Sequence, residues 1–425
     1  MRRGKLALLL ALSPGCDSEL SFGRLLDAQV VPFDAHVTLD AHVAPVDAGK
    51  SLPGFSCSAR GPLFDLTDTI GGACGSESLG AHYALCSCSG LIAGDSTQVD
   101  GFDSRLAPYV AGQASGTLAA NGELDPYALQ TGGSLIVAGS GGVPLMGDLV
   151  IGGNLLDQGP LLGAHSVTVG GNARIAGDVR LDRFQVAASC SVAPGSALEV
   201  ASGAPSATRE PVAIAAPCRC DGALDLASIL DRARVDNDNV ALGLDANNAL
   251  RAIDAPLERS LPCGRYYVRD ISAQRPITLH VTGRVALLVQ NRIWIDTAAS
   301  LTIDLADGAE LDLFVGQDIS ASGLVSIGAA SAPSRTRIFF GTSDTLSFAA
   351  TTTVAATLYA PHAELVTSGT FELFGAALVR RSAAAASLRL HYDRALSRDS
   401  CASASCRSNA DCSPLLRCDH GACLP

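Results

Sequence analysis

The sequence predicts a mainly β protein: a right-handed parallel β-helix with a short helical insertion and disulfide-rich ends. The first observation is an internal repeat, because residues 149–154 (LVIGGN) recur 18 residues later as 167–172 (VTVGGN). A short strand followed by glycines, at a period of about 20 residues, is typical of stacked solenoid coils. The second observation is composition. Hydrophobic residues make up 48% of the chain but aromatic residues only 5%, which suits a narrow interior filled by small and branched side chains.

Composition and charge also limit the partners. The chain has 425 residues and a net charge of −12, and its 30 basic residues form no basic stripe. Nucleic acid is therefore not expected as a partner. The sequence contains no nucleophile elbow, zinc-binding helix motif or phosphate loop. We therefore expect no catalytic residue, no metal site and no cofactor.

The N-terminus predicts export. Residues 1–16 form a predicted signal peptide, with a basic start, an apolar run over 6–12 and an end, SPGC, that resembles a bacterial lipobox. The apolar run is too short to span a bilayer. Cys16 is then the lipid-attachment residue, its partner is membrane lipid, and the protein lies at the outer membrane or cell surface. Pro14 departs from the usual small residue, so a secreted or periplasmic protein cleaved nearby stays open as the alternative.

Export to an oxidising compartment accounts for the 14 cysteines as disulfide partners. If Cys16 carries the lipid, an odd number remains, so at least one is unpaired or pairs between chains. The disulfide candidates are Cys57, Cys74, Cys86, Cys88, Cys190, Cys218, Cys220, Cys263, Cys401, Cys406, Cys412, Cys418 and Cys423.

Two segments precede the first predicted coil. Residues 17–56 are a predicted linker in which the tetrapeptide DAHV occurs twice. Its histidines, His36 and His42, leave a metal contact open, but a solvated tether is favoured. Residues 57–130 contain four cysteines and are predicted to form a disulfide-stapled N-terminal cap, because a solenoid needs its open end covered.

The β-helix domain is predicted over 131–396, and its first coils span 131–202. Apolar and polar residues alternate there, as in Val179-Arg180-Leu181, which places apolar side chains inward and the charge outward. Each coil should advance about 4.8 Å along the stack. The predicted strand cores are 135–137, 149–151, 167–169, 179–181 and 198–200.

Residues 203–265 interrupt this pattern. Three prolines lie in the first part of the segment, and a helical pattern follows. Asp221 is the predicted cap of the helix. The apolar face of the helix is predicted from the spacing of Leu226, Ile229, Leu230 and Ala233.

The rest of the insertion holds a polar run and a cysteine. The run DNDN at 236–239 offers ligands that calcium accepts, yet it lacks the glycine and the distant glutamate of an EF-hand loop, so a polar turn is favoured. Cys263 closes the insertion, and it is predicted to pair with Cys218 or Cys220.

Dense β patterning resumes over 266–396. The segments 289–293 and 315–319 share an arrangement in which apolar residues flank a three-residue corner, at an offset of 26 residues. The coils here are therefore longer or less regular. The predicted strands are 277–281, 285–289, 301–303, 311–315, 337–340 and 357–359.

Five motifs in this half carry a resemblance. They are LPCGRYY (261–267), GAELDLFV (308–315), LYAPHA (358–363), LFGAALV (373–379) and LHYDRAL (390–396). Together they resemble a β-helical domain of unknown function found in exported bacterial proteins, including pilus-assembly-like and adhesin-like ones. The resemblance covers residues 130–396. It implies the fold and brings no catalytic motif.

Residues 397–425 are a predicted Cys-rich C-terminal module. Five cysteines lie within 23 residues, and so short a segment cannot bury a core of its own. The sequences DC at 411–412 and CDHGAC at 418–423 are similar to Dickkopf-like cysteine-rich motifs of myxobacterial surface lipoproteins. This similarity implies a cell-surface context.

Two groups of residues are candidates for acid–base chemistry. His391 and Asp393 share one strand face, either as a general acid–base pair or, as favoured here, as a hydrogen-bonded pair that closes the last coil. Four carboxylates could serve a polysaccharide-cleaving β-helix, but their spacing mixes odd and even offsets, which should turn several of them apart. These four are Asp296, Asp304, Asp307 and Asp312.

The predicted function is that of a non-catalytic surface scaffold or display lipoprotein. The alternative is an adhesin-like module, in which a flat solenoid face rich in Thr, Ser and Asp binds extracellular polysaccharide or surface proteins. A polysaccharide-degrading β-helix enzyme is the least favoured interpretation, because a fold alone implies no chemistry.

Overall fold

The computed structural model describes residue 57 and residues 82–221, 224–396, 417–419 and 422–424. The predicted signal peptide with Cys16 and the linker 17–56 lie outside the described residues, as does most of the Cys-rich module. The same holds for His36, His42, Cys74, Cys401, Cys406 and Cys412.

The fold is a parallel β-helix, mainly β with few helices, as the sequence predicts. The strands from β1 to β28 belong to one sheet, and their pairings are parallel. The first group, called the N-terminal stack, comprises β1 (Leu85–Phe102), β2 (Leu118–Ala120), β3 (Glu123–Thr131), β4 (Leu135–Val137), β5 (Val143–Pro144), β6 (Leu149–Ile151), β7 (Leu155–Asp157), β8 (Leu161–Val169), β9 (Ala173–Ile175), β10 (Val179–Val186), β11 (Cys190–Val192), β12 (Leu198–Ser202) and β13 (Ala207–Arg209).

The second group, called the C-terminal stack, follows two short helices, α1 (Leu226–Ala233) and α2 (Asn239–Leu242). Its strands are β14 (Leu257–Leu261), β15 (Gly264–Val268), β16 (Ile271–Ala273), β17 (Ile277–Val281), β18 (Arg284–Val289), β19 (Ile293–Ile295), β20 (Ser300–Leu305), β21 (Glu310–Val315), β22 (Ile319–Ala321), β23 (Leu324–Gly328), β24 (Thr336–Phe340), β25 (Thr345–Phe348), β26 (Thr352–Thr367), β27 (Phe371–Ala384) and β28 (Leu388–Asp393). A 3-10 helix, η2 (Pro333–Arg335), precedes β24. In the C-terminal module, β29 (Arg417–Asp419) and β30 (Ala422–Leu424) pair antiparallel.

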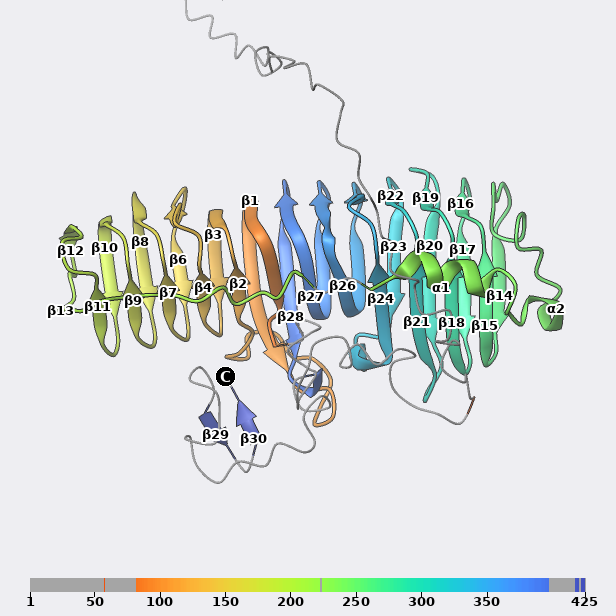
Figure 1. Ribbon diagram of the computed structural model, residues 1–425, viewed down its shortest axis with the longest axis horizontal. Helices are drawn as coiled ribbons and strands as arrows, with labels where there is room; N and C mark the ends of the chain where they lie inside the picture. Colours follow the sequence, from red (N-terminus) through yellow and green to blue (C-terminus); the bar gives the residue numbers. More distant parts are fainter. Residues whose placement is uncertain (1–56, 58–81, 222–223, 397–416, 420–421, 425) are drawn as a thin grey trace, which may run out of the picture. The chain divides into compact units, whose positions relative to one another are not determined.

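The order of the coils in space differs from their order in the chain. One edge of β1 pairs with β2 and β3, and its other edge pairs with β27 and β28. The described chain therefore starts in the middle of the stack and winds outward to β13. It then crosses to β14 at the other end and winds back until β28 lies beside β1 (Figure 1).

This order corrects two predicted boundaries. The segment 57–130 was expected to cap an end, but from Leu85 onward it forms the central coils, because β27 and β28 cover the edge that a cap would have left open. The interruption is also shorter than 203–265. β13 still pairs with β11 over 207–209, and β14 already pairs with β17 at Leu257.

The predicted repeat is confirmed by the register. Leu149 lies opposite Val167, and in the larger coils Val289 lies opposite Val315. The glycines of the repeat stand where coils approach closely: a Cβ added to Gly170 would lie 2.4 Å from the Gly152 carbonyl oxygen. The asparagines then join the coils, because the Asn172 backbone N–H donates to Asn154 Oδ1 at 2.9 Å.

The core runs through both stacks without interruption. Inward side chains of the two stacks form a single cluster of buried apolar residues. At the β14 end, Leu244 and Leu250 belong to this cluster and close the interior. At the β13 end, Leu198 and Val200 are only partly buried, so the last coil is less completely covered.

A second apolar feature lies on the outside of the coils. One outward position per coil forms a buried row, here called the outer row: Tyr267, Leu288, Phe314, Phe339, Tyr359, Leu378, Cys86, Ala119 and Ile136. Within it the rings of Phe314 and Phe339 stack with centroids 4.8 Å apart. The helix α1 covers part of this row with Leu226, Ile229 and Leu230 (Figure 1).

Helix α1 has the predicted apolar face, but its cap is different. Leu226, Ile229, Leu230 and Ala233 are its buried residues. The N-cap is Asp225, whose Oδ1 accepts from the Ser228 backbone N–H at 3.1 Å. Asp221 lies too far upstream, because an N-cap side chain reaches only the first turn of its helix.

The crossing between the stacks begins with residues 210–221, here called the return segment. It is fixed to the coils it passes: the Ile214 N–H donates to Gln158 Oε1 at 2.7 Å. The Asn121 side chain bonds to both backbone groups of Cys218, donating to its carbonyl oxygen at 2.7 Å and accepting from its N–H at 2.8 Å.

Three disulfides correct the predicted pairing of Cys263. Cys263 bonds to Cys57, whereas Cys218 bonds to Cys86 and Cys220 bonds to Cys88. The last two bridges join the return segment to β1, because the return segment crosses the outer row where Cys86 stands. Cys190, another disulfide candidate, is buried in the interior and pairs with no cysteine among the described residues.

One interior position carries a charged residue type. Asp157 is fully buried between Val137 and Ile175 of the adjacent coils. Its Oδ1 accepts from the Gly159 N–H at 3.0 Å, and its Oδ2 has no partner among the described residues. Burial raises the pKa of Asp157 to about 8, although the Gly159 N–H opposes the shift. The folded chain therefore holds this carboxyl protonated at neutral pH.

This carboxyl predicts a pH dependence. The unfolded chain releases the proton near the ordinary value of 3.8, so stability is highest below that pH and declines as the pH rises through about 8. Asp157→Asn should remove this decline and raise stability at pH 7 by about 4 kcal/mol. Thermal unfolding from pH 4 to 8 measures the slope, with exposed Asp307→Asn as the control. An unchanged slope in Asp157→Asn would contradict the assignment.

The disulfides predict protection of the return segment. Replacing both Cys88 and Cys220 by Ser should lower the free energy of unfolding by about 2–4 kcal/mol. It should also speed tryptic cleavage after Arg219, which lies between the two bridged cysteines. Mass spectrometry of timed digests measures the cleavage, with Cys190→Ser as the control that removes no bridge. Equal cleavage rates in all three proteins would refute the proposed protection.

Candidate functional site

A group of titratable and aromatic side chains lies where the two stacks meet. Asp100 of β1 is the register partner of His391 in β28, which in turn lies opposite Phe374 of β27. Glu372 of β27 and Tyr109, from the loop after β1, complete the group. We call these five residues the seam cluster, because they connect the first strand of the N-terminal stack to the last strands of the C-terminal stack.

Every polar atom of the histidine ring is engaged. His391 Nδ1 lies 2.6 Å from Asp100 Oδ1, and Nε2 lies 3.2 Å from Glu372 Oε1. The ring is also enclosed, because its centroid lies 4.3 Å from that of Tyr109 and 4.6 Å from that of Phe374. The His391 side chain is 6% exposed.

The electrostatics favour an ionised Asp100. Burial by itself would raise the pKa of this carboxyl, but hydrogen bonds from His391, the Gly112 N–H and the Tyr109 hydroxyl outweigh it and hold the pKa below its usual value. Burial, followed by the bond to Asp100, raises the pKa of Tyr109, so its hydroxyl stays a donor, at 2.8 Å from Asp100 Oδ2. The charged carboxylate therefore stabilises the seam at neutral pH.

This geometry suits a clamp rather than a reaction centre. A general base needs a ring nitrogen within reach of a substrate proton, and both nitrogens of His391 already face carboxylates inside the fold. The rings of Tyr109 and Phe374 close the faces of the imidazole. The arrangement can hold β1, β27 and β28 together, and it offers no open position at His391.

The predicted pairing of His391 with Asp393 is wrong. Asp393 instead accepts from the Ser104 backbone N–H at 3.0 Å, from the Ser104 hydroxyl at 2.6 Å and from the Ala395 N–H at 3.0 Å. Both residues do help to close the last coil, but each bonds to a different segment. Sequence reasoning missed the partner Asp100, because it is 291 residues from His391 and only the coil order brings the two together.

The four acidic candidates do not converge. Asp312 is buried, whereas Asp304 is half exposed and lies 2.8 Å from His280 Nδ1. Asp296 accepts from the next backbone N–H in a turn, and Asp307 is exposed in another turn. Asp304 and Asp312 thus lie on different strands with different partners, which fits the expectation that several of the four face apart.

Asp312 belongs to a buried ion cluster on β21 and β24. Arg337 Nε lies 2.5 Å from Asp312 Oδ1, and Arg337 Nη2 lies 2.9 Å from Glu310 Oε2. Burial raises the pKa of Asp312, and the guanidinium offsets this only in part. Asp312 and Arg337 are register partners in adjacent coils, so the cluster depends on coil stacking. Removing one member of such a buried pair leaves the other charge buried without its partner.

The polar run at 236–239 bonds to the chain itself. Asp236 pairs with the Arg265 guanidinium at 2.6 and 2.8 Å, and Asp238 Oδ2 accepts from the Arg265 backbone N–H at 2.8 Å. The Asn239 side chain donates to the Tyr267 carbonyl oxygen at 2.6 Å. The favoured polar turn is what the structure has here, and its side chains fix α2 to β15.

The described residues contain no cluster of three or more His, Cys, Asp or Glu side chains that could hold a metal ion. No helix in the described part of the chain is long and apolar enough to cross a membrane. Cys16, the predicted lipid-attachment residue, lies outside that part.

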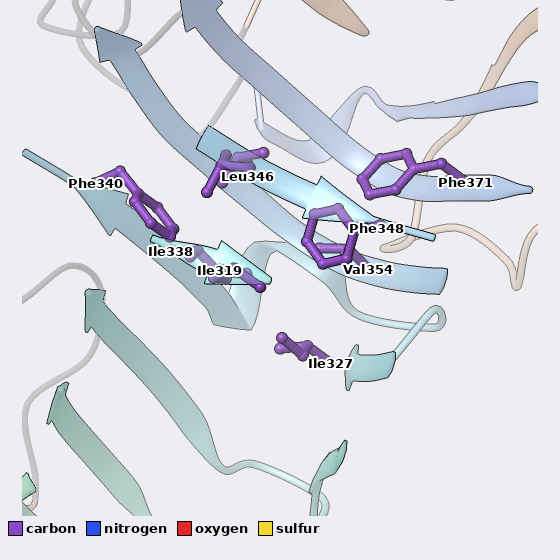
Figure 2. A pocket seen from close by; sticks show the side chains of 9 residues that line it. Ile319, Ile327, Ile338, Phe340, Leu346, Phe348, Val354 and Phe371 are labelled. Carbon is purple, nitrogen blue, oxygen red and sulfur yellow. The ribbon is translucent and has the colours of Figure 1, made fainter. Parts of the chain in front are cut away.

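The interior of the C-terminal stack contains an apolar cavity. Figure 2 shows the side chains that line it, from strands β22 to β27, and only carbon atoms appear in them. A ligand site needs a few polar groups to orient its occupant, and this cavity has none, so it is a packing defect of the core. Its lining residues are Ile319, Ile327, Ile338, Phe340, Leu346, Phe348, Val354, Leu358 and Phe371.

Comparison with known proteins matches one part of the chain. Residues 226–399 match the profile of a domain of unknown function (DUF7305). The match starts at the first residue of α1 and runs past β28, so it contains the C-terminal stack and the helix that covers its outer row. Of the resemblance expected over 130–396, a domain of unknown function is thus confirmed for the C-terminal stack, while residues 85–209 of the N-terminal stack lie outside the match. No curated protein and no solved structure matches the chain.

The seam cluster predicts a large loss of stability on mutation. His391→Ala should lower the free energy of unfolding by about 2–4 kcal/mol, because it leaves Asp100 and Glu372 facing each other without the ring between them. His280→Ala is a matched control, since His280 also lies between two carboxylates, Glu258 and Asp304, but in an exposed position. Urea unfolding measures both variants. Equal effects of the two substitutions would contradict the clamp.

Proposed function

We propose that this protein is a non-catalytic scaffold of the cell surface, held there by a lipid on Cys16. The observation that carries the proposal is the seam, where β1 pairs with β2 and β3 on one edge and with β27 and β28 on the other. Through it, two stacks of coils share one continuous core. A single core of parallel coils is stiff along its axis because each coil is hydrogen-bonded to the next.

The covalent connections support the same role. Cys86–Cys218 and Cys88–Cys220 bind the return segment to the middle of the stack, and Cys57–Cys263 binds the chain before β1 to the β14–β15 turn. Disulfides persist in proteins exposed to an oxidising environment. They resist unfolding outside the cell, where no chaperone can restore the fold.

The chemistry of the polar clusters supports a role without catalysis. The seam cluster, the Arg337 cluster and the turn at 236–239 each use their charges to join neighbouring segments. We infer that the rod presents the Cys-rich module of residues 397–425, whose motifs are similar to Dickkopf-like ones of myxobacterial surface lipoproteins. The pilus-assembly-like and adhesin-like proteins that its coil domain resembles have a matching surface context.

A second candidate is an adhesin-like module that binds polysaccharide or surface proteins. The observation that favours it is Trp294 of β19, a partly exposed tryptophan whose register partners on both sides are serines. A degradative enzyme is the third candidate. Release of unsaturated or reducing sugars from pectin-like polymers by the full chain would overturn the non-catalytic assignment.

The lipid anchor makes the proposal testable. Cells that express the full chain and grow with labelled palmitate should incorporate the label into the protein, and Cys16→Ser should abolish incorporation because it removes the acceptor thiol. Cys190→Ser is the matched control, since its thiol is buried in the core. Label retained in Cys16→Ser, or absent from the unaltered chain, would refute the anchor.

A further inference from the structure

The sole tryptophan of the chain lies on the outside of a coil. Trp294 is the middle residue of β19, and its neighbours Ile293 and Ile295 are 1% and 0% exposed. Because successive side chains of a strand point to opposite faces, the indole points outward. An outward position for the largest apolar side chain is unusual unless something covers it.

The adjacent coils cover the ring only in part. The register partners of Trp294 are Ser272 on β16 and Ser320 on β22. All three residues are partly exposed. Serine is too small to cover an indole fully, so part of the ring stays exposed. The outward aromatic pair Phe314 and Phe339 differs, because it stacks within the outer row and lies in the cluster that contains α1.

The indole also lacks partners within the described part of the chain. It belongs to none of the three clusters of apolar side chains. No described residue accepts a hydrogen bond from its N–H or contacts its ring as an aromatic or cationic partner. The exposed part of the indole is therefore available to an external molecule.

The surroundings of the ring are polar. Asp270, Arg292 and Asp318 directly precede the three strands β16, β19 and β22, and Gln274, Asp296 and Ser322 directly follow them. These side chains provide both donors and acceptors around one aromatic platform. Arg251 and Arg269 lie 3.9 and 4.0 Å from Asp270 Oδ2, so three guanidiniums and three carboxylates leave the rim close to neutral. Such a rim gives a charged ligand no net attraction.

We propose that the face around Trp294 binds a neutral glycan, with one sugar ring stacked on the indole. The C–H face of a sugar packs on an aromatic ring, and the hydroxyl groups around it need the mixture of donors and acceptors that this rim offers. A lipid surface would need a broader apolar patch, and a protein interface needs a cluster of buried anchors. The coils repeat at about 4.8 Å, so a linear glycan along the stack meets Ser272, Trp294 and Ser320 in turn.

This inference does not rest on the scaffold role. Glycan binding at β19 and lipid attachment at Cys16 are measured separately, so the failure of one leaves the other standing. The two fit together in a surface protein that is anchored at its N-terminus and holds a glycan on its coils.

The single tryptophan makes the site directly observable. Titration of the full, disulfide-intact chain with cellohexaose, laminarihexaose and chitohexaose should shift or quench the intrinsic tryptophan emission with at least one of them. An oligogalacturonate of the same length should bind more weakly, because its carboxylates lose hydration without gaining a net attraction from the rim. Since no other tryptophan exists in the chain, any saturable change reports on Trp294.

Variants then test whether the ring carries the binding. Calorimetry with the active oligosaccharide should show at least about tenfold weaker binding for Trp294→Ala and a smaller loss for Trp294→Phe, which keeps an aromatic face. Tyr127→Ala is the matched control, because Tyr127 is an aromatic residue that is 51% exposed on β3. It should bind as the unaltered chain does, and circular dichroism checks that each variant is folded.

Three outcomes would overturn the proposal. The first is no change in emission with any of the neutral oligosaccharides at millimolar concentration. The second is equal affinity of Trp294→Ala and the unaltered chain. The third is preferential binding of the oligogalacturonate, which would point to a basic site elsewhere on the coils.

Discussion

The architecture depends on the pairing of β1 with strands from both halves of the chain. An unpaired parallel edge exposes a row of backbone donors and acceptors that other chains can bind. Here the edge left by β27 and β28 is satisfied by β1, and the opposite edge of β1 is satisfied by β2 and β3. The seam cluster adds a hydrogen bond at this junction, between Asp100 and His391. The N-terminal stack thus continues the sheet from β27 and β28, which are the last strands of the segment that matches DUF7305.

Because of this pairing, the chain must cross the coils lengthwise between the end of one stack at β13 and the start of the next at β14. The crossing segment has few backbone partners of its own, so it depends on contacts with the outer row. The outer row, from Tyr267 to Ile136, is an apolar surface on which the crossing segment packs. The Asn121 side chain forms hydrogen bonds with the backbone of Cys218. Disulfides to Cys86 and Cys88 close loops with a sequence separation of 132 residues. Cross-links over such distances restrict the unfolded chain strongly.

Local patterns and long-range contacts differ in how far the sequence reveals them. Strands were predictable because alternation and the 18-residue repeat act within one or two coils, and the pairing of Leu149 with Val167 follows that repeat. The helix face at 226–233 was predictable for the same reason, although its cap was placed at Asp221 instead of Asp225. The partners of Cys263 and His391 were not predictable, because both depend on the order of the coils. That order is circularly permuted relative to the chain, and no local signal encodes it.

The outside of the coils shows how the chain treats its outward aromatic residues. Phe314 and Phe339 lie in the outer row, and α1 packs on the same cluster. If these two stacked rings were exposed, they would favour association with other molecules. Trp294 differs from this pair, because its register partners are serines and polar residues precede and follow its strand. The ring is only partly covered there, and it belongs to none of the apolar clusters of the fold. A ring kept outward, flanked by small polar residues and bordered by hydrogen-bonding groups, has the properties of a contact surface, and the stiff coils beneath it hold that surface in place.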